Sequence, residues 1–446
     1  MVALAAMPKY DSYRDSGYKW IGDVPSDWEV TKLGACLSPV SIKNRQDLPL
    51  LSITRELGVI ERDIGDQDSN HNFIPDDLSG YKVLMQGQFG MNKMKAWQGS
   101  YGVSKYTGIV SPAYFIFDFT KFVEPSFFNW AIRSKLYISY FGSASDGVRI
   151  GQWDLSKSRM KSIPFILPSP DEQKAIAKFL DKKTAQINEA ISIKEKQIAL
   201  LKERKQIIIQ KAVTQGLNPD VPMKDSGMGW IGQIPEHWTE PTKMKYISSL
   251  KGRQGWQGLK AEEYTDEGPH VLSSAHFNNH IIDWDKCPRV SMERYLMDKN
   301  IQLQVGDILL MKDGANMGKL AYVDKLPGAA CLNSHLLLFR SMSEGGELYF
   351  DTKFMFFHMM CNEFQDYVKV NGTGATFLGI SQESIGNYPI SLPPSLDEQR
   401  EIVSYLEMEV KQHNAAIKKQ ELQIEKLKEY KITLINSAVT GKIKVA

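Results

Sequence analysis

Two carboxylates and a lysine form the string in this sequence that most resembles a nuclease site. Pro170-Asp171 precedes Asp181-Lys-Lys183, an order in which nucleases hold a metal ion. A continuous helix, however, would place the two carboxylates about 15 Å apart, too far to share one ion. The second long helix predicted near the end of the chain has Glu407-Met-Glu409 at this position and lacks the lysine. The string therefore predicts a charged helix surface and no nuclease site.

Three other patterns also fail as catalytic sites. Gly314–Lys319 lacks the spacing and the Ser/Thr of a phosphate-binding loop, so it predicts a hairpin turn. His276 and His280, with His270 and Cys287, have no third metal ligand at a standard spacing. The sequence has no Asn-Pro-Pro-Tyr/Phe, which amino-methyltransferases use to hold a flipped adenine, and no glycine-rich cofactor loop behind a strand. We therefore expect no catalysis, no metal site and no cofactor in this chain.

Polar side chains in predicted loops suit a different chemistry, the reading of DNA. Lysine and arginine pair with phosphates and guanine edges, whereas asparagine and glutamine pair with adenine. A single such residue is more often a solvated surface residue than a base contact, so the clusters carry the prediction. The candidate DNA-binding residues are Lys43, Asn44, Arg45, Lys93, Lys95, Tyr106, Arg149 and Gln152 in the first half of the chain, and Lys251, Arg253, Gln254, Gln257, Lys312, Asn316, Lys319, Asn333, His335 and Asn371 in the second half.

The elements that position these residues occur twice. Asp15–Trp28 returns as Asp225–Trp238, at an offset of 210 positions, and both segments contain Trp-Ile-Gly-x-x-Pro-x-x-Trp. A repeat this long indicates a duplicated unit of a domain plus a helix rather than a solenoid. The tryptophans recur in register outside the variable loops, so we expect them to pack in the core and not to stack on bases. They are Trp20, Trp28, Trp230 and Trp238.

Each unit ends in a predicted long helix. Ser169-Pro-Asp-Glu172 and Ser395-Leu-Asp-Glu398 are capping boxes, and both helices finish in Ala-Val-Thr. Each helix has about 42 residues and would extend about 63 Å, longer than such a domain is wide. We expect the two helices to pair antiparallel as a coiled coil that separates the two domains by a fixed span; two helices packed on their own domains remain the alternative.

The heptad pattern of the first helix recurs in the second after a shift of 226 positions. Polar interruptions recur as well, at Lys194 and Gln420 and at Lys205 and Lys431, where they would fix the register of the pair. The predicted seam consists of Leu180, Ile187, Ile191, Ile198, Leu201 and Ile208 in the first helix, and of Leu406, Val410, Ile417, Ile424, Leu427 and Leu434 in the second.

The two domains share their strand pattern but differ in their loops. Val83–Lys93 aligns loosely with Gln302–Lys312, and Val110–Phe117 with Leu332–Phe339; short apolar runs bounded by Gly and Pro predict strands. Helical segments surround them, so the fold class is α+β, with two similar mixed α/β domains joined by two long antiparallel helices in pseudo-twofold fashion. The expected boundaries are domain 1 at 1–168, helix 1 at 169–215, domain 2 at 216–394 and helix 2 at 395–446.

Composition sets broad limits. The 446 residues suffice for two cores, and four scattered cysteines suggest neither a zinc framework nor disulfides. The sequence has no recognisable signal peptide and no apolar run of bilayer length, so we expect a cytoplasmic protein without membrane contact. The net charge of +2 permits a nucleic-acid partner without indicating one, although the first helix is basic and the second domain is acidic.

The duplicated order of these motifs resembles the specificity subunit of type I restriction-modification enzymes. The likeness covers the whole chain and rests on the two Trp-Ile-Gly-x-x-Pro-x-x-Trp segments, the two Pro…Asp-Glu-Gln helix starts and the two Ala-Val-Thr helix ends. It implies two target-recognition domains that each read half of a split DNA sequence across a helical spacer. It also implies partners: two modification subunits that use S-adenosylmethionine to methylate adenine, and restriction subunits that translocate and cleave DNA with ATP and Mg²⁺.

Two other classes of function remain open from the residues alone. The domains of an adaptor would bind protein or glycan, and an enzyme would carry an active site outside the known motifs. The two distinct sets of polar loop residues favour double-stranded DNA over both. The sequence reveals neither the target bases nor the length of the spacer.

Overall fold

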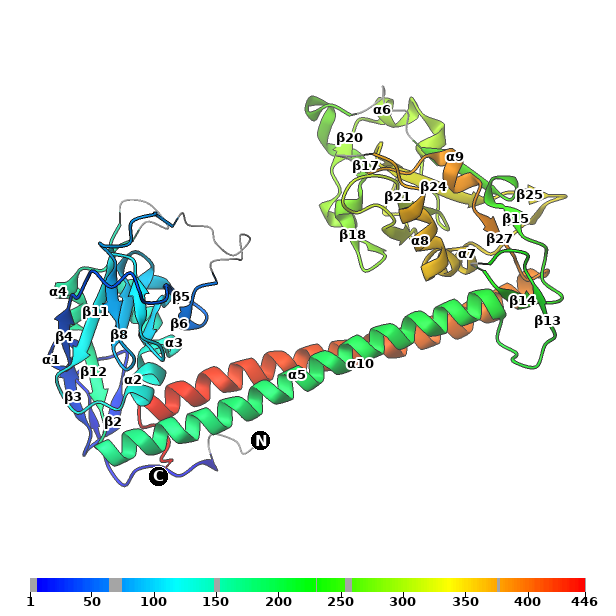
Figure 1. Cartoon of the computed structure of the whole chain (residues 1–446). Coiled ribbons are helices and arrows are strands. Elements are labelled where there is room, and N and C mark those ends of the chain that lie inside the picture. The colour runs from blue at the N-terminus through cyan, green and yellow to red at the C-terminus, as the bar shows by residue number, and fades with distance from the viewer. Residues whose placement is uncertain are drawn as a thin grey trace. The chain divides into compact units, whose positions relative to one another are not determined.

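The computed structural model describes residues 6–63, 74–147, 153–229, 231–252, 259–374 and 378–445. Contacts divide the chain into two units (Figure 1). The first unit comprises Met1–Glu195 with Glu421–Ala446, and the second comprises Lys196–Gln420. Each unit therefore contains one domain and half of each long helix.

The first unit is mixed α and β. Its strands are β1 (Tyr13–Asp15), β2 (Asp23–Pro25), β3 (Glu29–Lys32), β4 (Leu37–Val40), β5 (Leu51–Thr54), β6 (Gly58–Glu61), β7 (Lys82–Leu84), β8 (Phe89–Asn92), β9 (Tyr101–Val103), β10 (Gly108–Val110), β11 (Tyr114–Phe119) and β12 (Pro164–Leu167). Its helices, besides the long ones, are α1 (Leu33–Cys36), the 3-10 helix η2 (Lys93–Gln98), α2 (Pro125–Ile132), α3 (Lys135–Ser143) and α4 (Lys157–Ser162).

An antiparallel sheet of order β4-β11-β8-β9 forms the centre of this unit. The register pairs Tyr114 with Asn92 and Phe117 with Phe89. Phe89 and Phe117 are fully buried in the main core, together with the apolar side of α2. Burying each phenylalanine contributes about 2 kcal/mol, so the core fixes the register and thereby the loops at the strand ends.

The second unit repeats this plan. Its strands are β13 (Met223–Asp225), β14 (Gln233–Pro235), β15 (Thr242–Lys243), β16 (Ser248–Gly252), β17 (Tyr264–Leu272), β18 (Phe277–Asn278), β19 (Ile281–Ile282), β20 (Arg289–Val290), β21 (Ile308–Met311), β22 (Leu320–Tyr322), β23 (Ala330–Leu332), β24 (Leu336–Ser341), β25 (Ser343–Glu344), β26 (Glu347–Leu348) and β27 (Pro389–Ile390). Its shorter α-helices are α6 (Met292–Leu296), α7 (Thr352–Met359), α8 (Asn362–Val370) and α9 (Gln382–Gly386).

The central sheet of the second unit has the order β16-β24-β21-β22, which matches the first sheet strand for strand. Its register pairs Leu336 with Met311 and Phe339 with Ile308. A three-stranded sheet of order β20-β17-β23 covers a separate apolar cluster. In the first unit the parallel pairing of β17 with β23 is reduced to a single bridge between Leu50 and Ile109. The predicted duplication is thus confirmed for the scaffold, whereas the additions to it differ.

The two long helices are α5 (Pro170–Gln215) and α10 (Leu396–Val439). Gly216 and Gly441 follow them with φ of 74° and 70°. This left-handed conformation ends a helix and favours glycine. At about 1.5 Å per residue, the 46 residues of α5 extend about 69 Å. Among the described residues, every helix is too short or too polar to span a bilayer.

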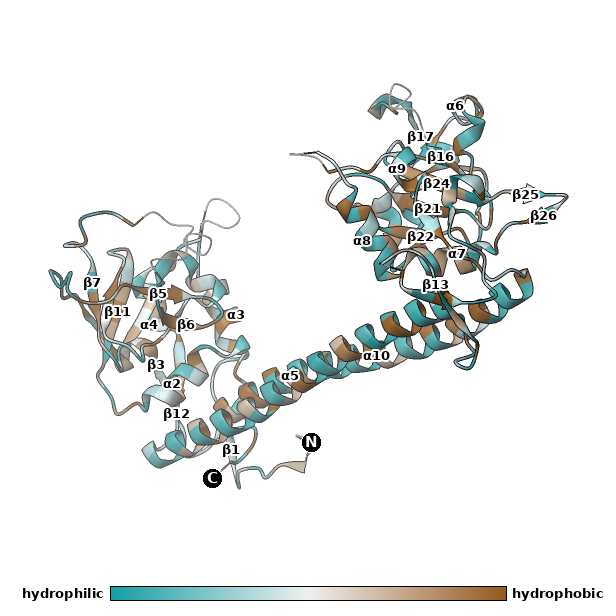
Figure 2. Cartoon of the chain, turned by 45° about the vertical axis from the view of Figure 1, so that its right-hand side comes forward, coloured by the Kyte–Doolittle hydropathy of each residue, from teal (hydrophilic) through white to brown (hydrophobic). Residues whose placement is uncertain are grey.

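Within each unit the two long helices pair antiparallel, as predicted. In the first unit Lys431 Nζ donates to Asn188 Oδ1 at 2.8 Å. In the second unit Lys205 Nζ donates to Asn414 Oδ1 at 3.0 Å. The second pair is the first pair shifted by 226 positions with the helices exchanged, so both units use the same register contact. In Figure 2 the helices alternate hydrophobic and hydrophilic colour, as expected when one face is buried.

The seam residues differ in burial. The exposed fraction is below 9% for Leu180, Ile187, Leu406, Ile417, Ile424, Leu427 and Leu434. It is intermediate for Ile191, Ile198, Leu201, Ile208 and Val410.

The start of each long helix is fastened to its domain by the same side chains. Trp28 Nε1 donates to Glu172 Oε2 at 3.0 Å, and Trp238 Nε1 donates to Glu398 Oε1 at 2.9 Å. Ser395 Oγ accepts from Glu398 N–H at 3.2 Å, as a capping box predicts. The glutamate carboxylates, however, bind the indoles instead of turning back to the helix start, because the tryptophans are buried against them. Trp28 and Trp238 are therefore packing residues, as predicted.

Candidate nucleic-acid interface

One end of the first central sheet gathers many of the predicted DNA-binding residues. β4 and β8 end there, at Val40 and Asn92, and β11 begins there, at Tyr114. We call this end, with the loops that leave it, the first rim. Lys93 lies at the rim because it follows β8, and its carbonyl accepts from Leu155 N–H at 3.3 Å. The next loop is closed by paired backbone hydrogen bonds between Asp146 and Asp154.

The second unit has an equivalent end, which we call the second rim. β21 ends there at Met311, and β24 begins at Leu336. Lys312 follows β21, and its carbonyl accepts from Ile380 N–H at 2.8 Å. The loop beside it is closed by paired backbone hydrogen bonds between Thr373 and Gly379. The two rims therefore share the same backbone contacts.

Four further predicted residues join Lys312 at the second rim. Asn316 and Lys319 lie in the turn from β21 to β22, which is the hairpin turn predicted for Gly314–Lys319. Asn333 and His335 lie between β23 and β24. The amide oxygen of Asn333 accepts from His335 N–H at 3.1 Å, and Lys319 Nζ donates to Ser274 O at 3.4 Å. The sheet topology thus places these side chains in neighbouring loops.

Asp313 is a residue of the second rim that the sequence analysis did not include. Its Oδ1 lies 2.7 Å from His335 Nδ1, and the side chain is 18% exposed. Asn371 caps the end of α8 next to the closed loop, and its side-chain amide donates to Tyr367 O at 2.9 Å. Lys251 is exposed near the end of β16. The predicted residues Arg253, Gln254 and Gln257 lie outside the described residues.

In the first unit, three consecutive predicted residues leave β4 at the rim. Lys43, Asn44 and Arg45 are exposed, and Asn44 has a φ of 62°. The guanidinium of Arg45 donates to both carboxylate oxygens of Asp47, at 2.8 and 2.7 Å. This bidentate ion pair occupies the Nε and Nη2 donors of the guanidinium, which remains exposed at the surface.

The other predicted DNA-binding residues of the first unit do not all lie at the first rim. Lys93 forms an ion pair with Asp154 at 3.0 Å, and Lys95 is exposed in η2. Tyr106 follows β9, whose last residue Val103 pairs with Phe89 at the start of β8, so it lies at the opposite end of the sheet. The structure therefore does not bring Tyr106 together with the rim residues. The predicted residues Arg149 and Gln152 lie outside the described residues.

Two lysines of the first rim were missed by the sequence analysis. Lys82 Nζ donates to Tyr114 O at 2.7 Å, and Lys157 Nζ lies 4.8 Å from the centre of the Phe115 ring. Burial lowers the pKa of Lys82, and the nearby charges of Lys157, Lys43 and Lys93 lower it further. No local motif marks these lysines, since the fold brings them together from β7 and α4. Ser156, which caps α4, marks in the sequence where this helix begins, but it does not show that Lys157 lies near Lys82.

Residues of the patterns that were rejected as catalytic sites make hydrogen bonds within the fold. Asp181 accepts from Trp130 Nε1 at 2.8 Å. His276 Nδ1 accepts from Ser273 N–H at 3.1 Å, and His280 Nδ1 lies 3.0 Å from Leu320 O. Within the described part of the chain, no three His, Cys, Asp or Glu side chains are grouped for metal binding. All four cysteines are buried.

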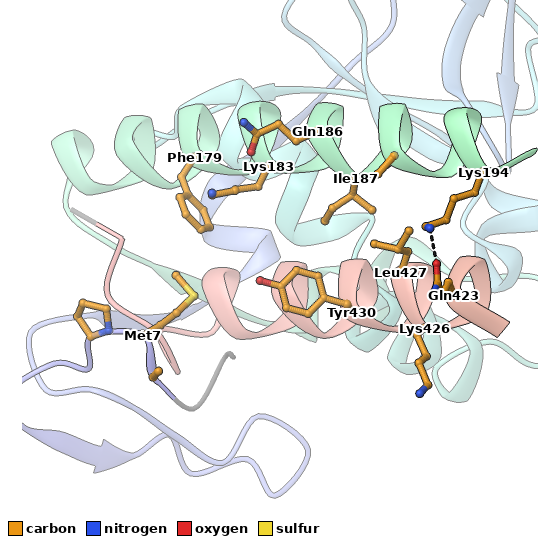
Figure 3. A pocket seen from close by; sticks show the side chains of 13 residues that line it. Met7, Phe179, Lys183, Gln186, Ile187, Lys194, Gln423, Lys426, Leu427 and Tyr430 are labelled. Atoms are coloured by element: carbon orange, nitrogen blue, oxygen red, sulfur yellow. Dashed lines mark hydrogen bonds between the residues drawn. The ribbon is translucent and has the colours of Figure 1, made fainter. Parts of the chain in front are cut away.

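The first unit also has a groove between the long helices (Figure 3). It has a volume of about 560 Å³ and an apolar lining that includes Phe179, Ile187, Leu427 and Tyr430. Figure 3 shows the side chains of Lys183, Lys194 and Lys426 around it, with Lys194 Nζ donating to Gln423 Oε1.

Comparison with known proteins identifies the family of this chain. The sequence matches the family model described as "Type I restriction modification DNA specificity domain" over residues 126–199 and 260–426, more than half of the chain. It is 24% identical to the putative type I restriction enzyme MjaX specificity subunit of Methanocaldococcus jannaschii, covering 97% of this chain and 98% of that protein. It is 22% identical to the type I restriction enzyme EcoDI specificity subunit of Escherichia coli, covering 86% and 82%.

Two solved structures share the fold. One is a chain from work on complex assembly and conformational transition of the type I R-M system, with a TM-score of 0.70, 17% identity and coverage of 94% of this chain and 99% of that chain. The other is the HsdS subunit from Thermoanaerobacter tengcongensis, with a TM-score of 0.55, 17% identity and coverage of 94% and 98%.

Proposed function

Because this chain belongs to the type I restriction modification DNA specificity family, we propose that its two rims recognise the two halves of a split DNA target. The chain is the non-catalytic subunit that selects the DNA sequence for such a system. One observation carries the assignment to the rims: the same backbone scaffold occurs twice and presents different side chains. Lys93 is followed by Met94 at the first rim, whereas Lys312 is followed by Asp313 at the second.

The rim side chains match the chemistry of base edges in the major groove. Lys312 and Lys319 suit guanine or phosphate, Asn316 and Asn333 suit adenine, and a carboxylate such as that of Asp313 accepts from the amino group of cytosine. Each good contact discriminates against a wrong base by about 1–3 kcal/mol. The candidate DNA-binding residues at both rims are therefore proposed as the readers of the two half-sites.

The paired helices α5 and α10 are proposed to set the spacing of the half-sites. Both helices are continuous, and an equivalent Lys–Asn hydrogen bond joins them in each unit. Base pairs between the half-sites would go unread. Joining two readers in one chain also raises the effective concentration of the second reader once the first is bound, so two short half-sites act as one selective site.

The partners are proposed to be two modification subunits, which carry S-adenosylmethionine and methylate adenine, and restriction subunits, which use ATP and Mg²⁺. Two copies are expected because the duplicated helices and domains offer two similar surfaces. The lysine-rimmed apolar groove between α5 and α10 supports docking of an acidic, amphipathic segment of such a partner.

Sequencing of methylated adenines in single DNA molecules, from cells with and without this gene, tests the recognition function. We expect a split motif with a fixed spacer that disappears when the gene is deleted. An unchanged set of methylated sites would contradict the proposal. A gel shift of the assembled complex at increasing salt excludes the adaptor alternative, because DNA affinity falls steeply with salt.

The mass of the co-expressed complex tests the proposed stoichiometry. Size-exclusion chromatography with light scattering should give two modification subunits for each copy of this chain. An assembly with a single modification subunit would contradict the docking of two copies.

A further inference from the structure

We propose that Lys82, Lys93 and Lys157 of the first rim bind a backbone phosphate of the DNA, and that this site anchors the first unit independently of sequence. We call these residues the lysine cluster. The proposal rests on the proposed function. It adds that the two rims bind DNA differently, because the first rim has a phosphate-binding site that the second rim lacks at the equivalent place.

The geometry brings the three lysines to the start of β11. Lys82 Nζ donates to the carbonyl of Tyr114, and Lys157 Nζ lies over the neighbouring Phe115 ring. Lys93 follows Asn92, which pairs with Tyr114 in the sheet. The three side chains come from β7, η2 and α4, so the folded sheet assembles the cluster. A lysine bonded to one carbonyl retains two N–H donors for a further oxygen.

The charges of the lysine cluster are only partly balanced. Asp154 pairs with Lys93 at 3.0 Å, while Lys157 and the nearby Lys43 are exposed. The pKa of Lys82 is lowered, first by burial and then by the charges of Lys157, Lys43 and Lys93. Like charges held this close repel one another, and an anion bound among them would relieve the repulsion. A phosphate of the DNA backbone supplies such an anion and releases counterions when it binds.

The second rim differs at the matching positions. Ser156 and Ser381 cap α4 and α9 in the same way, but the first helical residue is Lys157 in one and Gln382 in the other. Beside Lys312 stands the Asp313–His335 pair, which adds a carboxylate. The second rim therefore offers hydrogen-bonding groups for bases where the first rim offers cations for phosphate.

The test uses the full chain in complex with its modification subunits. Lys157→Gln is the main variant, because this exposed residue can be changed without a loss of buried contacts; Lys82→Gln/Lys157→Gln is the second variant. Affinity is measured by fluorescence anisotropy at several salt concentrations, on a duplex with the methylated motif and on a scrambled duplex. Lys105→Gln is the matched control, since this exposed lysine follows β9 at the opposite end of the same sheet.

We expect the slope of log affinity against log salt to fall in both variants, more in the double variant than in the single one, by up to about 0.9, which is the contribution of one phosphate. The loss should be similar on both duplexes, the methylated motif should stay the same, and Lys105→Gln should keep the wild-type slope. An unchanged slope in both variants, an equal change with Lys105→Gln, or a loss confined to the motif duplex would each overturn the proposal. Failure of the wild-type complex to bind either duplex would instead contradict the proposed function.

Discussion

Gln173 and Gln399 make equivalent hydrogen bonds at the starts of α5 and α10. Gln173 Oε1 accepts from Glu124 N–H at 2.8 Å, and its Nε2 donates to Pro168 O at 2.9 Å. Gln399 makes the equivalent bonds with Asp351 N–H at 2.7 Å and Pro393 O at 3.0 Å. Both side chains are 1% exposed. Each glutamine thus satisfies buried backbone groups that would otherwise cost about 1–3 kcal/mol each.

The sequence identified the repeated Asp-Glu-Gln motif but not its partners. The glutamate was interpreted as part of a capping box, a local pattern, whereas its carboxylate binds Trp28 or Trp238 far along the chain. Lys82 and Lys157 of the first rim were missed for the same reason. Local patterns report neighbours within a few residues, and these contacts depend on how strands and helices meet.

The burial of His358 predicts that the stability of the second unit depends on pH. It is 6% exposed, and its Nε2 lies 3.1 Å from the hydroxyl of Tyr388. Burial lowers the pKa of His358 to about 4, from an ordinary value of about 6.5. The unfolded chain therefore takes up a proton that the folded chain resists as the pH falls from about 6.5 to about 4. Stability is full above this window and should decrease within it by up to about 3 kcal/mol.

Urea unfolding of the wild-type chain and of His358→Gln, between pH 7 and pH 4.5, measures this effect. We expect the difference in the free energy of unfolding between the two proteins to shrink as the pH falls. A constant difference across the range would contradict the assignment to His358.

At the scale of elements, the lysines in the helix seam lower the stability of the helix pair. Burial lowers the pKa of both Lys205 and Lys431. Leucine at either position would remove the desolvation cost and leave only an asparagine at the surface. We therefore expect Lys205→Leu and Lys431→Leu each to raise the free energy of unfolding by about 1 kcal/mol, at the expense of a defined register.

Thermal and urea unfolding check this prediction, with Lys196→Leu at an exposed position of α5 as the control. The control should leave stability nearly unchanged. If both seam variants were destabilised, the lysines would contribute more through their bonds to asparagine than they cost through burial.

The elements themselves were largely predictable. The helices α5 and α10 begin at the predicted capping boxes and end at the predicted Ala-Val-Thr segments, because capping residues and heptads are local signals. The aligned strands Val83–Lys93 and Gln302–Lys312 do contain β8 and β21. The direction of each strand was not predictable, however, and it decides at which end of a sheet a loop lies. Tyr106 was grouped with rim residues for this reason.

At the scale of the whole molecule, the length of the helices should determine the spacer of the DNA target. Four residues inserted into α5 near Lys196 add about 6 Å to the helix, and base pairs are spaced about 3.4 Å apart. We expect the preferred spacer to lengthen by one or two base pairs, with both half-sites unchanged. Sequencing of methylated adenines measures the spacer directly.

An insertion of four residues between Gly345 and Gly346, in the turn between β25 and β26, is the control and should leave the spacer unchanged. An unchanged spacer after the insertion into α5 would show that the helices do not determine the distance between the half-sites.

Equivalent main-chain hydrogen bonds close the loops at the two rims: Lys93 with Leu155 and Asp146 with Asp154 in one unit, and Lys312 with Ile380 and Thr373 with Gly379 in the other. Such bonds form with almost any amino acid at these places. Mutations there can consequently accumulate while the protein keeps folding, and one half of the target can change during evolution while the other is inherited intact.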